Sequence, residues 1–301
     1  MKPPVGASER LRSLRCGAFL ERQLPGCSAR TSRGDQMDRQ QLADVLDVEM
    51  AARLLPDSAV AALGLWLRGA GAQYAKGPGS HAVPYTPSRW AAVAPWPGSL
   101  ADRSGTGSAL LSRGQAVSAV RGALAREEWV EALVASYVWG QGRTGYGPHR
   151  LAEIVKESGV ADRLAEAAEV LRSNGAVASY SVLRGAVKGL GPAFFTKLLY
   201  FLGPAVGSVP PTAPLILDMR VARVLRAHAA GIGEQMGEQS AAKVAAWIWS
   251  DGGWTPHRYG VYLRWMTAAS GQLASAGIGW PPACPDLLEL AFFEGRWNPT
   301  A

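Results

Sequence analysis

The stretch Leu183-Arg-Gly-Ala-Val-Lys-Gly-Leu-Gly-Pro-Ala-Phe-Phe-Thr-Lys-Leu-Leu-Tyr-Phe-Leu202 carries the strongest local signal in the chain. It predicts a helix that ends near Val187, a tight turn over 189–191, and a second helix that begins at Pro192, whose fixed φ suits a first helical position. The two glycines of the turn allow positive φ and a close approach of the backbone to a partner. The amides at the start of the second helix can then receive a phosphate oxygen.

The rest of the chain is also mostly helical. Two helices are predicted at 42–54 and 58–67, and a stretch rich in Gly, Pro, Ser and Trp follows over 69–107. Helical periodicity then recurs in segments separated by Gly, Pro or Asn, at 113–125, 127–138, 149–158, 160–173, 178–187, 192–202, 219–230, 239–250 and 257–274. Strand signals are scarce. We expect a mainly α fold, an orthogonal array of helices with an irregular N-terminal part.

Charge and composition suggest three parts: 1–36, 37–107 and 108–301. The first holds seven Lys/Arg and three acids, so it carries +4 of the formal charge of +7. It fits an organellar transit peptide or sequence upstream of a start at Met37, and we expect a leader outside the fold. The second part would hold the N-terminal helices and the Trp-rich stretch, which is long enough to be a linker or a functional surface. The third would be the helical domain.

The composition also excludes several classes of protein. With 48% hydrophobic and 18% charged residues the chain is globular, and its apolar runs are far shorter than the ~20 residues of a membrane-spanning helix. The three cysteines, Cys16, Cys27 and Cys284, cannot form a disulfide framework or a four-cysteine zinc or iron–sulfur site. We expect a cytoplasmic protein without a metal site.

A second informative segment, Pro214-Leu-Ile-Leu-Asp-Met-Arg-Val-Ala-Arg-Val224, follows the hairpin. Asp218 ends an apolar run before a helical pattern and is an expected N-cap. Residues 184–226 contain six Lys/Arg and one acid, a local charge of +5, while the rest of the chain after residue 36 sums to −2. Such a local concentration of positive charge is typical of a nucleic-acid-binding surface.

These two segments carry a family resemblance. The hairpin looks like a helix-hairpin-helix motif, and 217–223 is similar to the Asp segment of helix-hairpin-helix DNA glycosylases, with Arg220 where many members carry His. About residues 110–270 resemble the 8-oxoguanine DNA glycosylase branch, and more closely bacterial proteins with that fold. The resemblance implies base excision repair of oxidised purines by N-glycosidic cleavage, with AP lyase activity, so the enzyme would be a hydrolase and a lyase.

The same resemblance implies partners and cofactors. We expect double-stranded DNA as the partner, no membrane, a monomer, and a cytoplasmic, nucleoid-associated protein. No cofactor and no iron–sulfur cluster are expected, and a monovalent cation at the hairpin is the one candidate ion.

The resemblance assigns the nucleophile to Lys197 and the assisting carboxylate to Asp218. The family's lysine would fall at Ala193, and Lys197 lies one helical turn further along the same face, about 6 Å along the axis. A lysine must lose its proton to attack the sugar C1′. The plain alternatives are a solvated or phosphate-contacting lysine and an aspartate that only caps a helix.

Two further groups of contacts are predicted. The DNA backbone would be bound by Lys188, Gly189, Gly191, Ala193, Arg220 and Arg223. The Gly-rich loop 139–150 would form the base pocket, because an extruded base is read by stacking and by hydrogen bonds to its edge; its candidates are Trp139, Gln141, Arg143 and Tyr146. The aromatic stripe Tyr259, Tyr262 and Trp265 fits a core helix or a pocket wall.

Two other functions remain open. A non-catalytic helix-hairpin-helix DNA-binding module would explain why Ala193 stands where the family has lysine. A protein-interaction scaffold would use the Trp-rich 69–107 stretch.

Overall fold

The computed structural model describes residues 31–104, 107–143, 145–207 and 213–299, with side chains from residue 39 onward. The predicted leader therefore lies largely outside the described residues. The chain divides into two units, Met1–Asp38 and Arg39–Ala301, and all that follows concerns the second.

The fold of this unit is mainly α, as predicted. The described residues contain one two-stranded sheet, β1 (Ala82–Tyr85) and β2 (Ala109–Ser112). They also contain the helices α1 (Thr31–Ala52), α2 (Asp57–Arg68), α3 (Arg113–Leu124), α4 (Trp129–Gln141), α5 (Gly147–Ile154), α6 (Val160–Asn174), α7 (Ala176–Leu183), α8 (Pro192–Val206), α9 (Met219–Gln235), α10 (Ala241–Ile248), α11 (Pro256–Ser275) and α12 (Pro285–Phe293).

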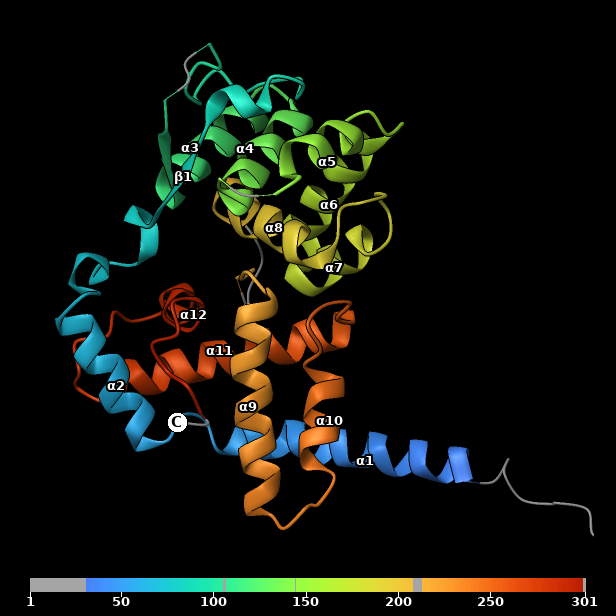
Figure 1. Ribbon diagram of the computed structural model, residues 1–301, viewed down its shortest axis with the longest axis vertical. Coiled ribbons are helices and arrows are strands. Elements are labelled where there is room, and N and C mark those ends of the chain that lie inside the picture. Colours follow the sequence, from blue (N-terminus) through green and yellow to red (C-terminus); the bar gives the residue numbers. More distant parts are fainter. Residues whose placement is uncertain (1–30, 105–106, 144, 208–212, 300–301) are drawn as a thin grey trace, which may run out of the picture. The chain divides into compact units, whose positions relative to one another are not determined.

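The helices of this unit form two groups (Figure 1). Helices α3 to α8 lie together, and α9 to α12 lie together with α2 and the part of α1 from Arg39 onward. The segment 213–218 leads from α8 in the first group to α9 in the second. The start of α9 therefore lies where the two groups meet.

The Trp-rich stretch 69–107 is folded onto the helices. Tyr74, Tyr85 and Trp90 are buried in the core, and β1 pairs antiparallel with β2 from Ala82 opposite Ser112 to Tyr85 opposite Ala109. The two strands lie on either side of the predicted boundary at residue 107. Neither strand has a clear pattern in the sequence, because each has only four residues and the first contains Pro84.

The hairpin differs from the prediction in two details. The first helix, α7, ends at Leu183 instead of Val187, and two turns connect it to α8. Gly189 has the expected positive φ of +81°, but Gly191 has φ −80°, which any residue adopts. The second helix begins at Pro192 as predicted. Helix α12 was not predicted at all.

Candidate functional site

Lys197 and Asp218 line the same cavity. Its volume is about 310 Å³, at the small end of ligand pockets. Both groups of helices and β1 contribute to it. The lining residues are His81, Ala82, Val83, Pro84, Arg113, Trp139, Gly140, Gln141, Lys197, Ile216, Asp218, Glu289 and Phe293.

Lys197 is a buried lysine whose side chain is held in place. Only 8% of the residue is exposed, its Nζ donates a hydrogen bond to the carbonyl of Ala193 at 2.7 Å, and it lies 5.3 Å from the ring centroid of Phe194. Burial lowers the pKa of Lys197 because it penalises the charged ammonium, and the guanidinium of Arg113 lowers it further; the carboxylates of Asp218 and Glu289 act in the opposite direction. This shift is toward the neutral amine, which is the nucleophilic form.

Helix α4 makes room for this lysine by means of a glycine. A Cβ on Gly140 would lie 2.5 Å from Lys197 Cδ and 3.2 Å from Cε, so only glycine allows the lysine chain to pass this close to α4. The alkyl chain of Lys197 is therefore packed against helix backbone instead of lying in solvent.

Asp218 is the N-cap of α9, as predicted: its Oδ1 accepts hydrogen bonds from the amides of Arg220 at 2.9 Å and Val221 at 3.1 Å. Hydrogen bonds hold the extended segment before Asp218 on both sides. Thr196 Oγ1 accepts from the amide of Leu217 at 3.2 Å. Because Thr196 precedes Lys197 in α8, this bond links the two candidate catalytic segments directly.

The other side of this segment is held by the aromatic stripe of α11. Of the two interpretations offered for this stripe, a core helix or a pocket wall, the first is confirmed, because all three aromatic residues are buried in the core. Tyr259 Oη donates to the carbonyl of Leu215 at 2.9 Å and accepts from its amide at 3.2 Å. Tyr262 Oη donates to the carbonyl of Ile216 at 2.5 Å. Burial raises the pKa of both tyrosines well above the usual value, so both remain donors.

Three polar residues of the cavity were missed by the sequence analysis: His81, Arg113 and Glu289. Arg113 and Glu289 form a buried ion pair, 2.8 Å between Nη1 and Oε2. A signal did exist for Glu289, which stands alone among apolar residues in Leu287–Phe293. Burial and Arg113 lower the pKa of His81 to about 4, so its ring is neutral at pH 7.

The predicted base-pocket residues separate into two pairs. Trp139 and Gln141 line the cavity, where the ring of Trp139 packs edge-on against His81 and Phe201. Arg143 and Tyr146 lie on the loop that follows α4 and are not among the lining residues; Tyr146 is 84% exposed.

This loop is tied to the Trp-rich stretch. Arg89 donates to the carbonyl of Arg143, and to that of Gly145 at 3.0 Å. Arg143 in turn donates to the Oγ of Ser108, the residue directly after this stretch, at 2.8 Å. The stretch therefore supports a cavity wall and the neighbouring loop, and it is not a free linker.

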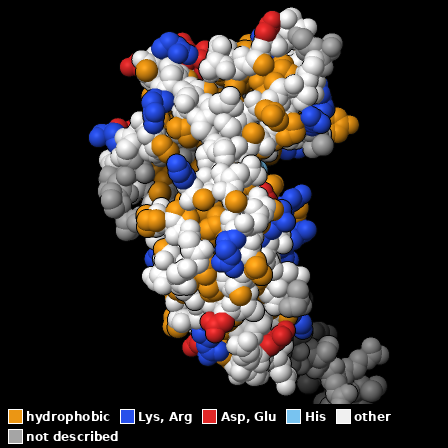
Figure 2. Space-filling model, turned by 90° about the vertical axis from the view of Figure 1, so that its left-hand side faces the viewer, with side chains coloured by type: hydrophobic (Ala, Val, Ile, Leu, Met, Phe, Trp, Pro, Cys, Tyr) orange, Lys and Arg blue, Asp and Glu red, His pale blue; other side chains and the backbone are white. Residues whose placement is uncertain are grey.

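The predicted backbone-binding residues lie in two places. Lys188, Gly189 and Gly191 are exposed at the turn before α8, and Ala193 follows in its first turn. Arg220 is not among the lining residues of the cavity, but its guanidinium carbon lies 4.7 Å from the ring centroid of Phe293, which is one of them. On the face drawn in Figure 2, Lys and Arg side chains stand in several separate groups, and some of these groups lie beside Asp or Glu side chains.

Part of the predicted positive charge is paired. Arg223 and Arg226 both donate to the carboxylate of Asp251, with 3.1 Å between Arg223 Nε and Oδ1. These hydrogen bonds lower the pKa of Asp251 to about 2. The acid is distant in sequence, so counting charges over 184–226 could not reveal this pairing.

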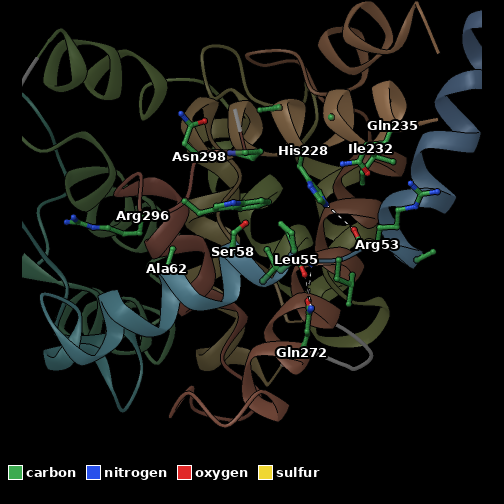
Figure 3. Close-up of a pocket in the computed structure, with 17 residues that line it drawn as sticks. Arg53, Leu55, Ser58, Ala62, His228, Ile232, Gln235, Gln272, Arg296 and Asn298 are labelled. Atoms are coloured by element: carbon green, nitrogen blue, oxygen red, sulfur yellow. Dashed lines mark hydrogen bonds between the residues drawn. The ribbon is translucent and has the colours of Figure 1, made fainter. Parts of the chain in front are cut away.

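A larger cavity, about 580 Å³, lies elsewhere, between the end of α1, α9 and the C-terminal residues (Figure 3). Two of its polar side chains bond to backbone: His228 Nε2 is 3.1 Å from the carbonyl of Arg53, and Gln272 bonds both the amide and the carbonyl of Leu55 at 2.9 Å. It contains neither Lys197 nor Asp218. Size alone therefore does not identify the reactive site.

Among the residues that the structure describes, no group of three or more His, Cys, Asp or Glu side chains could hold a metal ion. Within the same residues no single helix is long and apolar enough to cross a membrane. The pair Arg39–Ala52 and Asp57–Arg68, bent by 57°, meets that criterion jointly, by length and composition alone.

Comparison with known proteins identifies the family. No curated protein and no solved structure matches the chain significantly. A family model described as "Putative 8-oxoguanine DNA glycosylase OGG-like protein" matches residues 76–293, more than two thirds of the chain. The match extends beyond the expected 110–270 at both ends and includes β1 and α12, which complete the cavity. The chain belongs to the family of 8-oxoguanine DNA glycosylase-like proteins.

Proposed function

We propose that this protein is a DNA repair enzyme that excises oxidised purines of the 8-oxoguanine type from double-stranded DNA, with AP lyase activity. One observation carries the proposal: Lys197, buried and with a lowered pKa, lines the same cavity as Asp218. Perturbed amines beside a carboxylate in a cavity are typical of covalent catalysis.

In the proposed reaction, the neutral Nζ of Lys197 attacks C1′ of an extruded nucleotide. The N–C1′ bond forms as the glycosidic bond breaks, and the electron pair of that bond leaves with the base. The carboxylate of Asp218 stabilises the positive charge that develops on the sugar. The amine then loses a proton as the sugar ring opens to a Schiff base. Loss of a C2′ proton finally expels the 3′ phosphate and cleaves the strand.

Other residues would position the DNA. Trp139 and Gln141 would contact the extruded base inside the cavity, and Arg143 and Tyr146 would contact DNA outside it, since they lie on an exposed loop. The turn before α8 would hold a phosphate through the backbone amides at the helix start, with Lys188 beside it. Arg220 and Arg223 would contact the backbone, and a monovalent cation at the turn remains a prediction.

The experiment is borohydride trapping on a duplex that contains 8-oxoguanine. Wild type is expected to give a covalent adduct, because borohydride reduces the Schiff base to a stable amine. Lys197→Met, which keeps an unbranched apolar chain in the buried site, is expected to give none. The matched control is Lys156→Met, which replaces a lysine whose side chain is 68% exposed. Absence of an adduct from wild type, or an unchanged adduct from Lys197→Met, rejects the nucleophile. Salt-dependent duplex binding without base release supports a non-catalytic DNA-binding protein instead.

A further inference from the structure

The ion pair between Arg113 and Glu289 lies at the cavity and is almost fully shielded from solvent. The two side chains are 2% and 1% exposed, and they come from α3 and α12, which are 176 residues apart in sequence. The guanidinium carbon lies 5.1 Å from the ring centroids of both Trp139 and Tyr200. The cation is thus held by a carboxylate and two aromatic faces.

Stability alone does not explain this pair. Desolvating two charges costs several kcal/mol per ion, and replacing a buried pair by apolar side chains of similar volume is often neutral or stabilising. Arg113 Nε is also buried without a hydrogen-bond partner, which adds a further cost. Burial raises the pKa of Glu289 to about 7, and the guanidinium limits that rise. A costly charge pair at a cavity wall is more readily explained by chemistry in the cavity.

Lys197 is the neighbour on which such charges would act. Trp139 precedes Gly140, the residue against which the lysine chain packs, and Tyr200 lies one helical turn after Lys197 on α8. The charged groups that act on the amine come from three elements: Arg113 on α3, Asp218 at the start of α9 and Glu289 on α12. Helix α4 contributes no charged group to the cavity lining. From β1 and the residue before it, the only titratable lining residue is His81, whose ring is neutral at pH 7.

We propose that Arg113 and Glu289 are positioning residues that set the charge state of Lys197: the guanidinium disfavours a second cation in the cavity, and the carboxylate holds the guanidinium in place and moderates its effect. This inference rests on the proposed role of Lys197 as the nucleophile. The pair touches neither the sugar nor the base in this scheme. It influences the protonation of the amine before DNA arrives.

The two members of the pair act on Lys197 with opposite signs, which gives a test that a structural role would not pass. Glu289→Gln removes an anion, keeps the shape of the side chain, and is expected to move the titration of Lys197 to lower pH. Arg113→Met removes a cation, leaves Glu289 unpaired, and is expected to move that titration to higher pH. Arg113→Lys keeps the charge and is expected to restore most of the wild-type behaviour.

The first measurement needs no enzymatic activity. The chain has six lysines, so NMR of protein with labelled lysine side chains can follow each ammonium group through a pH titration, with Lys197→Met assigning the signal of interest. The second measurement is the pH profile of adduct trapping, whose rising limb is expected to shift with the NMR titration. The matched controls are Arg172→Met and Glu169→Gln, which alter an exposed ion pair on α6.

Each outcome either supports or overturns the inference. Opposite shifts in Glu289→Gln and Arg113→Met support the inference. If they occur and wild type gives no adduct, the electrostatic role stands and the glycosylase function fails. Equal losses of activity at every pH, with an unmoved Lys197 titration, overturn the inference. Should both single variants unfold, Arg113→Met/Glu289→Leu leaves no unpaired buried charge. The carboxylate has the stronger effect, so this variant is expected to titrate Lys197 at lower pH, and an unchanged titration overturns the inference.

Discussion

The packing of Lys197 against Gly140 yields a sharp prediction for Gly140→Ala. In a helix interior this change normally stabilises by about 1 kcal/mol, because alanine has the higher helix propensity. Here the new Cβ would stand 2.5 Å from Lys197 Cδ, whereas ordinary contacts begin at 3.4 Å, so the lysine chain must move by about 0.9 Å. A displacement of about 1 Å of a reacting group costs on the order of 100-fold in rate.

The assay combines single-turnover adduct trapping with thermal unfolding. Gly140→Ala is expected to lose about 100-fold in trapping rate while it remains folded, since the clash falls on a side chain and not on backbone. Gly271→Ala is the matched control: Gly271 lies inside α11 with no atom within 4 Å of its Cβ position, so it should gain stability and keep full activity. Wild-type trapping by a folded Gly140→Ala would refute the placement of Lys197 as the nucleophile.

Three further predictions concern the supports of the site and the charge around it. Thr196→Val keeps the side-chain shape but leaves the amide of Leu217 without its acceptor, so it should lower the free energy of unfolding, measured in denaturant, by about 1–3 kcal/mol. It should also reduce adduct trapping more than the control Ser181→Ala, which removes an exposed hydroxyl on α7. Equal trapping by the two variants would contradict the link between the two segments. Asp251→Asn frees two arginines, so duplex binding should tighten, and the slope of log affinity against log salt should steepen by the amount expected for up to about two additional phosphate contacts. An unchanged slope in a fluorescence titration would place those arginines away from DNA. The pKa of Asp251 in the folded state is depressed to about 2, so its ion pairs contribute stability above the unfolded pKa of 3.8, and this stability is lost as the pH falls through about 2. NMR titration of this carboxyl should therefore show a midpoint well below that of Asp251 in unfolded peptide.

Local patterns were sufficient for the parts of the structure that local physics determines. Pro192 begins α8 because its φ suits a first helical turn, and Asp218 caps α9 because its carboxylate accepts the free amides that follow. Helical spacing placed Lys197 on a face with Ala193, and the lysine donates to the carbonyl of that residue. These features depend on residues within one or two helical turns of each other.

Contacts across long sequence separations could not be predicted in this way. No local pattern pairs Arg113 with Glu289 or Arg223 with Asp251, because each partner lies on another element. Helix α12 was missed although its residues are strongly apolar. The early end of α7 at Leu183 was also not predicted, because the apolar pattern continues to Val187, which is buried although it lies between two turns outside the helix.

The antiparallel pairing of β1 with β2 has a consequence for how the protein reaches its working state. The residue before β1 and the strand itself contribute His81 to Pro84 to the cavity, while α12, about 200 residues further along the chain, contributes Glu289 and Phe293. The site is therefore assembled from sequence-distant segments whose contacts are slow to form. A truncated chain that begins at residue 108 would contain both Lys197 and Asp218 and still lack the part of the cavity wall that residues 81–84 form.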